Sequence, residues 1–157
     1  MDPSNKVWEL LQQLKQDAST DADTQVAAVI VDKAGEIVTA GANKHTQGFP
    51  VTAENSTRPE KYDYIEHAER IAIFDAAYAG RALEGTEMYV EVFPCVECAR
   101  AIVQSGITTL HHGSTEGFDP AKYKFDKARE ILEAGGVELT DWTSYLVGIN
   151  TVPEDVS

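Results

Sequence analysis

The chain has 157 residues, of which 43% are hydrophobic and 25% are charged, as in an ordinary soluble globular domain with a substantial core. Its formal net charge is −13 at pH 7, and such a surface repels phosphate backbones, so a nucleic-acid polymer is not an expected partner. No stretch is long and apolar enough for a membrane span, and the polar first residues do not form a signal-peptide pattern. We therefore expect one domain, residues 1–157, without a membrane partner and in the cytoplasm.

The start of the chain predicts a helix followed by a β-hairpin. Asp2 can cap a helix in which Pro3 takes the first position, and apolar residues then recur at helical spacing through residues 3–17. Residues 25–31 are rich in Val, Ile and Ala, and a turn separates them from a second strand at residues 36–41. We expect these two strands to pair.

Residues 42–66 show no apolar period and carry Gly48, Pro50 and Pro59, which predicts a long loop. A loop of this length inside a compact domain is usually functional. We therefore expect this segment to contribute to a functional site.

The second half of the chain alternates between helices that end at glycines and short apolar strands. The predicted order is helix 67–79, strand 87–93, helix 96–105, strand 107–112, helix 119–134 and strand 137–140. Such alternation favours parallel neighbouring strands joined by right-handed crossovers. The tail, residues 141–157, is too apolar for a free linker. We expect it to pack on a core of about residues 3–140 or on a neighbouring subunit.

Two short motifs in this half hold metal-ligating side chains. His67 and Glu69 open one predicted helix, and Cys95 and Cys98 follow Pro94 at the start of another. Residues three apart share a helix face, so both sulfurs can point to one spot, where the positive end of the helix favours thiolates. One imidazole, two thiols and a spare carboxylate make the ligand set of a catalytic zinc with an open fourth position and a proton carrier. Because Glu69 lies roughly 200° around the helix from His67, we expect it to serve a bound water and not the metal.

The cysteine pair alone permits other interpretations. A C-x-x-C motif between a strand and a helix is also typical of a thioredoxin-like dithiol oxidoreductase, and it can form half of a structural zinc site. Cys95 and Cys98 are the only cysteines, so no disulfide framework is expected, and free thiolates fit a reducing compartment. A dithiol enzyme would have no use for Glu69, and a metal-stabilised binding module would tolerate its loss. The combination with His67 and Glu69 favours the catalytic zinc.

These motifs resemble those of a known family. The H-x-E…P-C-x-x-C pattern is the signature of zinc deaminases, and the chain resembles the cytidine and deoxycytidylate deaminase superfamily, most closely the deoxycytidylate (dCMP) deaminases. The similarity runs from about residue 24 to residue 137, and its strongest pieces are Thr24-Gln25-Val26, Gly41-Ala42-Asn43, Lys61 to Glu69, and Phe93 to Ala99. The resemblance implies a cytidine-deaminase-like three-layer α/β/α fold. It also implies a five-stranded mixed sheet whose last strands are parallel.

The resemblance further implies the cofactor, the reaction and the partners. His67, Cys95 and Cys98 would bind Zn²⁺, and Glu69 would shuttle protons during hydrolytic deamination of a cytosine-type ring. The expected reaction converts dCMP to dUMP with release of ammonia. The alternative is the same chemistry on a nucleoside, a free base or another aminated heterocycle. The partner is thus a small molecule, and because relatives are usually oligomeric we expect a homo-oligomer.

The loop before the first motif both matches and departs from the family. Asn43 matches an asparagine that contacts the sugar in relatives. Ala42, Lys44 and Thr46 stand where the relatives usually have Tyr, Gly and Pro. Because these positions lie in the substrate-facing loop, this difference counts against dCMP as the specific substrate and does not affect the assignment to the deaminases.

Four more residues are candidates for substrate binding. Arg58 and Lys61 carry cations in the loop that could hold a 5′-phosphate. Tyr64 and Phe93 are candidates for stacking on the base. Further candidates for a substrate contact are Lys44, His45, His111 and His112, and the histidines are also candidates for a second zinc.

Overall fold

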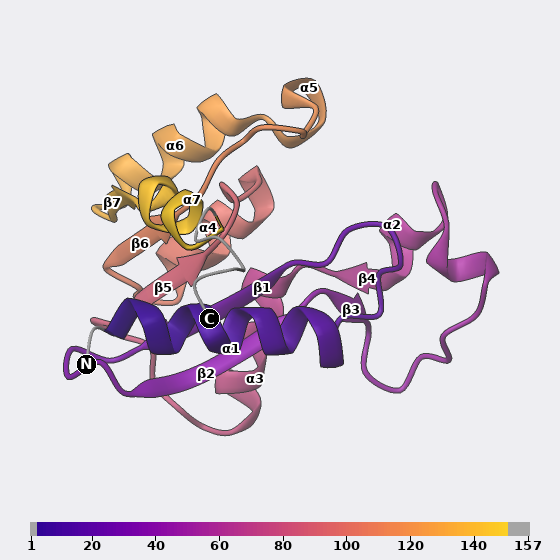
Figure 1. Ribbon diagram of the computed structural model, residues 1–157, viewed down its shortest axis with the longest axis horizontal. Coiled ribbons are helices and arrows are strands. Elements are labelled where there is room, and N and C mark those ends of the chain that lie inside the picture. Colours follow the sequence, from indigo (N-terminus) through magenta and orange to yellow (C-terminus); the bar gives the residue numbers. More distant parts are fainter. Residues whose placement is uncertain (1–2, 151–157) are drawn as a thin grey trace, which may run out of the picture.

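The computed structural model describes residues 3–150 and places a five-stranded mixed sheet between two layers of helices (Figure 1). The strand order is β2-β1-β5-β6-β7, with β1 antiparallel to both neighbours and β5, β6 and β7 parallel to one another. The strands of this sheet are β1 Ala27–Val31, β2 Ile37–Ala42, β5 Glu87–Val90, β6 Thr109–His112 and β7 Glu138–Asp141. The predicted three-layer α/β/α fold and its parallel last strands are confirmed.

The helices cover the two faces of the sheet. α3, α4 and α6 pack on one face, and α1 and α7 pack on the other. Their bounds are α1 Pro3–Asp17, α3 Ala68–Tyr78, α4 Val96–Gln104, α6 Phe125–Ala134 and α7 Thr143–Asn150. Strand β1 is buried throughout because Ala28 and Ile30 contribute to the core under α3 and α4, whereas Val29 and Val31 contribute to the core under α1. A strand buried on both faces has a continuous apolar sequence, as residues 27–31 do.

The parallel half of the sheet brings the ends of β5 and β6 close together. Met88 pairs with Leu110 across these strands, and both side chains are fully buried. Immediately after β6 the backbone of Gly113 runs against Glu91, so that an added Cβ would lie 1.8 Å from the Glu91 carbonyl oxygen. Only glycine fits at this crossing, which lies beside the chain that continues into the C-x-x-C motif.

Residues 42–66, predicted as a loop, contain short regular elements. β3 Lys44–His45 pairs with β4 Ile65–Glu66, and between them lie the 3-10 helix η1 Glu54–Ser56 and the short α2 Lys61–Tyr64. The buried His45 imidazole holds the segment in place. Its Nδ1 lies 2.7 Å from the Thr20 hydroxyl and its Nε2 lies 3.1 Å from the Asn55 carbonyl oxygen. Elements of two to four residues have no detectable period, so the sequence did not reveal them.

Two other predicted elements differ from the structure. The predicted helix 119–134 is divided into α5 Pro120–Tyr123 and α6, because Lys124 adopts a left-handed conformation with φ of 52°. The tail forms α7, preceded by Trp142, whose indole donates a hydrogen bond of 2.7 Å to the Val90 carbonyl oxygen. This part of the tail therefore packs on the sheet, whereas the predicted Asp2 cap and residues 151–157 lie outside the described residues. Every helix within residues 3–150 is too short or too polar to cross a bilayer.

Candidate zinc and substrate site

His67, Cys95 and Cys98 meet where two helices begin. The His67 Nδ1 atom lies 3.5 Å from the Cys95 sulfur and 3.4 Å from the Cys98 sulfur. A tetrahedral zinc with a nitrogen at about 2.0 Å and a sulfur at about 2.3 Å holds those two atoms about 3.5 Å apart. The spacing of the three ligand atoms, all within 4.8 Å of one another, therefore fits Zn²⁺. Among the described residues this is the one group of three or more His, Cys, Asp or Glu side chains with such spacing.

The fold explains why these three side chains converge. His67 immediately precedes α3 and Cys95 immediately precedes α4, and the two helices pack side by side on the same sheet face. Cys98 lies one turn into α4, so it returns to the side from which Cys95 points. A hydrogen bond from the Cys98 thiol, together with His67, lowers the pKa of Cys95 to about 3, and the Cys95 thiolate in turn raises the pKa of Cys98. The site thus favours a thiolate, which is the form that binds metal.

Glu69 lies beside this group without joining it. Its side chain comes from the first turn of α3, is 4% exposed and lines the same cavity as His67 and Cys95. Burial raises the pKa of the Glu69 carboxyl above its usual range. A buried carboxyl with a raised pKa, next to a metal site, is suited to general acid–base work.

Arg70 is a further part of the site that the sequence analysis missed. Its guanidinium donates from Nε to Glu66 at 2.6 Å, lies 3.2 Å from Glu97 and approaches the Cys98 sulfur at 3.5 Å. A cation at this distance stabilises a thiolate. The signal in the sequence was its position three residues after His67, which places both on one side of α3.

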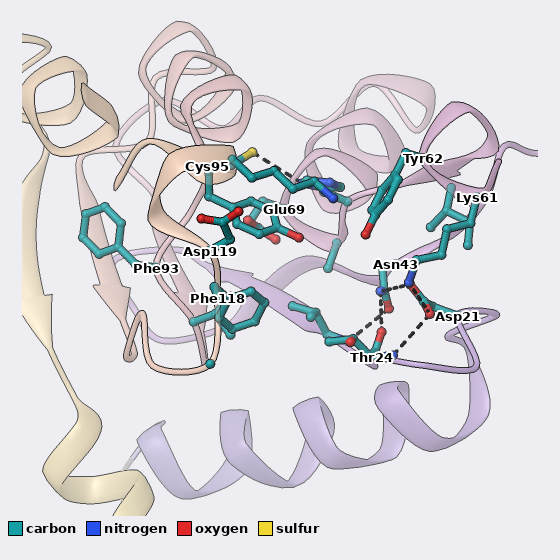
Figure 2. Close-up of a pocket in the computed structure, with 18 of the residues that line it drawn as sticks. Asp21, Thr24, Asn43, Lys61, Tyr62, Glu69, Phe93, Cys95, Phe118 and Asp119 are labelled. Carbon is teal, nitrogen blue, oxygen red and sulfur yellow. Dashed lines mark hydrogen bonds and ion pairs between the residues drawn. The ribbon is translucent and has the colours of Figure 1, made fainter. Parts of the chain in front are cut away.

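A cavity of about 330 Å³ opens beside the metal-ligand group, a size at the small end of ligand pockets (Figure 2). Its walls come from residues 21–26, α2, the start of α3, the segment 92–95 that follows β5, and the segment 117–125. Figure 2 shows Cys95 and Glu69 between Phe93 on one side and Tyr62 with Lys61 on the other. The cavity thus extends in two directions from the metal site.

Four of the five predicted substrate-binding residues line this cavity: Asn43, Arg58, Lys61 and Phe93. Tyr64 is not among the lining residues, because its ring stacks on Phe49 with centroids 4.7 Å apart. Phe93 is 5% exposed and makes edge contacts with His112 and Phe125. The structure therefore gathers residues that are far apart in the sequence, but leaves Tyr64 outside.

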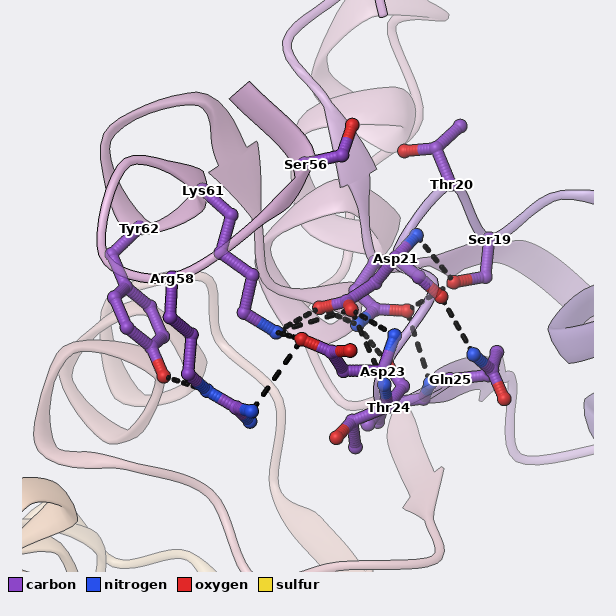
Figure 3. Close-up of polar contacts among 12 residues, drawn as sticks. Ser19, Thr20, Asp21, Asp23, Thr24, Gln25, Ser56, Arg58, Lys61 and Tyr62 are labelled. Atoms are coloured by element: carbon purple, nitrogen blue, oxygen red, sulfur yellow. Dashed lines mark hydrogen bonds and ion pairs between the residues drawn. The ribbon is translucent and has the colours of Figure 1, made fainter. Parts of the chain in front are cut away.

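Asn43 (Figure 2) and Lys61 (Figure 3) are already engaged in a polar network. The Asn43 amide oxygen accepts from the Ser19 hydroxyl at 2.6 Å and the Val26 amide at 3.0 Å, and its nitrogen donates to the Thr24 carbonyl at 2.8 Å. The Lys61 ammonium, 4% exposed, lies 3.0 Å from the Asp21 carboxylate. These bonds hold the wall of the cavity.

The same network sets the charge of Asp21. Burial favours the neutral carboxyl, but hydrogen bonds from Lys61 and from the backbone amides of Asp23 and Thr24 outweigh it and lower the pKa of Asp21. Asp23 also lies 3.4 Å from Lys61 and 3.4 Å from Arg58. Asp21 and Lys61 therefore form a buried pair, whereas Arg58 is 57% exposed at the rim.

The remaining histidines are occupied elsewhere. His111 lies 2.8 Å from Glu87 and stacks on Tyr89, and the buried His112 bonds the Gly113 carbonyl. His45 is bound between Thr20 and Asn55. Within residues 3–150, none of these three histidines belongs to a group of side chains placed to bind a metal.

The segment between β6 and α6 supplies a wall that the sequence analysis did not foresee. Phe118, Asp119, Lys122 and Tyr123 all line the cavity. The aromatic rings of Phe118, Tyr123 and Phe125 contact one another. Aromatic residues in a short polar segment directly after a parallel strand were the available signal, because open α/β sheets bind ligands at the carboxyl ends of strands.

Comparison with known proteins shows to which family the chain is related. It matches the family model described as the cytidine and deoxycytidylate deaminase zinc-binding region over residues 1–114. It is 33% identical over 156 residues to a probable deoxycytidylate deaminase of Drosophila melanogaster, which covers 87% of this chain and 73% of that one. It is 35% identical over 132 residues to the deoxycytidylate deaminase of Mus musculus, covering 80% and 71%.

Solved structures agree on the fold. The crystal structure of dCMP deaminase from the cyanophage S-TIM5, in complex with dCMP and dUMP, superposes with a TM-score of 0.69 at 24% identity, covering 90% of this chain and 98% of that one. The architecture and the His–Cys–Cys group define a zinc-dependent hydrolytic deaminase. The chain belongs to the cytidine and deoxycytidylate deaminase family. This membership decides between the interpretations of the C-x-x-C motif in favour of the metal site.

Proposed function

We propose that the protein deaminates dCMP to dUMP and releases ammonia. The observation that carries the proposal is the His67–Cys95–Cys98 group with the buried Glu69 beside it in a cavity of about 330 Å³. The relatives from Drosophila melanogaster and Mus musculus are named as deoxycytidylate deaminases, the first as a probable one, and this supports the choice of substrate.

In the proposed mechanism, His67 Nδ1 and the two thiolates would hold Zn²⁺, which would supply a water molecule made nucleophilic near neutral pH. Glu69 takes a proton from the attacking water as it adds to C4 of the cytosine ring. The same carboxyl gives this proton to the ring nitrogen, then takes the proton of the hydroxyl group added at C4 and passes it to the amino group, which leaves as ammonia while the C4 carbonyl forms. Its burial supports this role, because a raised pKa lets one group both accept and return a proton.

The residues predicted to bind substrate take different parts in the proposal. Arg58, exposed at the rim, contacts the 5′-phosphate, and Phe93 lines the end of the cavity that takes the base. Asn43 and Lys61 affect substrate binding mainly by holding the cavity wall in position. Tyr64 supports the loop through Phe49.

A second candidate is the same chemistry on another aminated heterocycle. The observation that favours it is the Asn43 side chain, whose amide is bonded to Ser19, Val26 and Thr24 and has little capacity left for a sugar. It agrees with the unusual residues around Asn43 in the sequence.

We also propose a cytoplasmic homo-oligomer. The free thiols of Cys95 and Cys98 support a reducing compartment. Phe74 and Tyr78, 51% and 85% exposed on the outer side of α3, support burial against another copy. Sedimentation of the zinc-loaded protein tests the assembly, and a monomer at all concentrations would contradict it.

The proposed function is tested by comparing kcat/KM for dCMP with that for deoxycytidine, cytosine and adenosine, with ammonia release as the readout. We expect dCMP to be preferred by at least roughly tenfold, because a charged phosphate contact adds that much or more. A better turnover of an uncharged heterocycle would refute dCMP as substrate and leave the deaminase class in place. Glu69→Gln is the control: it should keep zinc and fold but lose at least roughly a hundredfold in kcat. Normal turnover by this variant would contradict the proton-carrier role.

A further inference from the structure

Tyr62 lies between two cations that come from different parts of the chain. The Arg58 Nε atom donates to the Tyr62 hydroxyl at 2.7 Å (Figure 3). The Lys122 ammonium, from α5, lies 3.1 Å from the centre of the Tyr62 ring. All three side chains line the cavity of the metal site. Two segments far apart in the sequence thus meet on one aromatic ring at the cavity.

The cations that line this cavity differ in how they are neutralised. Lys61 is buried and lies 3.0 Å from Asp21, so its charge is neutralised within the cavity wall. Arg58 is exposed and keeps a looser contact of 3.4 Å with Asp23. Lys122 has no carboxylate within 4.0 Å among the residues that the structure describes, and its described contacts are with tyrosine rings. Of the three cations, Lys122 is therefore the one without a carboxylate partner, and Arg58 is the one with only a loose partner.

The nearby acid does not compete for this lysine. Asp119 opens α5 and also lines the cavity, but its carboxylate accepts the amide hydrogen of Ala121 at 3.0 Å. Lys122 and Arg58 together also lower the pKa of Tyr62, which shows that positive charge gathers at this hydroxyl. In a chain of net charge −13, such a place is where an anionic substrate can be held.

We propose that Lys122 and Arg58 form a two-armed clamp for the 5′-phosphate of the substrate, with Tyr62 setting the positions of both arms. The inference rests on the proposed function and adds to it a residue, Lys122, and the part played by Tyr62. A cation resting on an exposed aromatic ring is weakly held, so Lys122 can exchange the ring for a phosphate oxygen. Arg58 keeps its Tyr62 bond through Nε and has its outer nitrogens free to turn from Asp23 to the phosphate. Figure 2 shows Tyr62 away from Phe93, with Cys95 and Glu69 between them, so the phosphate end and the base end of the cavity are distinct.

The test uses zinc-loaded wild type, Lys122→Gln, Arg58→Gln and the double variant, with kcat/KM measured for dCMP and for deoxycytidine. Binding of the product dUMP by calorimetry gives a readout that does not depend on turnover. The matched control is Lys127→Gln, an exposed lysine of α6 that does not line the cavity. We expect each single variant to lose roughly ten- to a hundredfold for dCMP, mainly in KM, and to weaken dUMP to a similar degree. Deoxycytidine turnover should change by less than about threefold. The control should match the wild type.

The outcomes separate the two claims. Preference of the wild type for dCMP, unchanged in Lys122→Gln, would overturn the clamp and leave dCMP as substrate. An equal loss for dCMP and deoxycytidine would also overturn it, because Lys122 would then act on the shape of the site and not on the phosphate. A wild type that does not prefer dCMP would overturn the proposed substrate, and the clamp with it.

Discussion

The buried pair of Lys61 and Asp21 makes a prediction that separates a structural role from substrate binding. In Lys61→Met the aliphatic stem is kept and the ammonium is removed. Lys61 is 4% exposed and Asp21 is 7% exposed, so the variant leaves a carboxylate buried without its main cation. We expect the variant to fold and to be clearly less stable than the wild type at pH 7.

The magnitude follows from the bonds that remain. Removing one partner of a buried ion pair costs about 3–5 kcal/mol of unfolding free energy. Asp21 keeps hydrogen bonds from the amides of Asp23 at 2.9 Å and Thr24 at 3.2 Å, so we expect the lower end, about 3 kcal/mol. For a domain of this size that corresponds to a fall in Tm of roughly 6–12 °C.

The pH dependence checks the cause. A carboxyl whose pKa is lowered in the folded state stabilises the fold above its unfolded pKa, and this contribution is lost as pH falls through the folded value. In Lys61→Met the effect of burial is no longer offset by the ammonium, so the unpaired carboxyl takes up a proton at a higher pH than in the wild type, which removes the buried charge. The stability difference between the two proteins should therefore shrink as pH falls from 7 toward 4 and below.

The assay is denaturant unfolding of both proteins at several pH values with a fixed excess of zinc, because ligand binding shifts apparent stability. Lys127→Met, on the exposed side of α6, is the control and should stay within about 0.5 kcal/mol of the wild type. A Lys61→Met variant as stable as the wild type, or a deficit that does not change with pH, would refute the reasoning. Retained stability with lost use of dCMP would instead show that Lys61 binds substrate directly, as the sequence suggested.

Two further outcomes follow from the site and the fold. Metal analysis should find about one zinc per chain, and its removal by a chelator should lower Tm, since metal binding contributes to folding; absence of zinc together with a Cys95–Cys98 disulfide by mass spectrometry would contradict the metal site. Gly113→Ala should cost roughly 3 kcal/mol or more, because the new Cβ meets the Glu91 backbone at 1.8 Å. Gly148→Ala in α7, where no atom of the described residues outside the local helix lies within 4 Å of the added Cβ, should be neutral or stabilise by up to about 1 kcal/mol. Similar unfolding curves for the two glycine variants would show that the crossing at Gly113 can relax.

Local patterns in the sequence predicted the main helices and strands. Helix α1 occupies residues 3–17 as expected, because the apolar residues that recur at helical spacing in the sequence are the ones that the helix packs against the sheet. The position of Lys124 in a left-handed conformation has no such pattern, so the break between α5 and α6 was missed. The two-residue strands β3 and β4 were missed for the same reason.

The cofactor chemistry could also be predicted from the sequence. Cys95 and Cys98 lie within one helical turn, so their spacing alone places both sulfurs together, and His67 with Glu69 forms a second local unit. Family membership and the distances around His67 Nδ1 agree with that prediction of a zinc site. Such motifs are informative because each is held by short-range geometry that any fold must respect.

Tertiary structure alone decided which polar side chains are available for the substrate. From the sequence, Lys61 and Arg58 were equivalent cations of one loop, and Lys122 belonged to a predicted helix about sixty residues away that was given no part in the site. Folding buried Lys61 against Asp21, left Arg58 at the rim and brought Lys122 onto Tyr62. The charge that a side chain can offer depends on its burial and on partners from distant segments, and neither is encoded in local spacing.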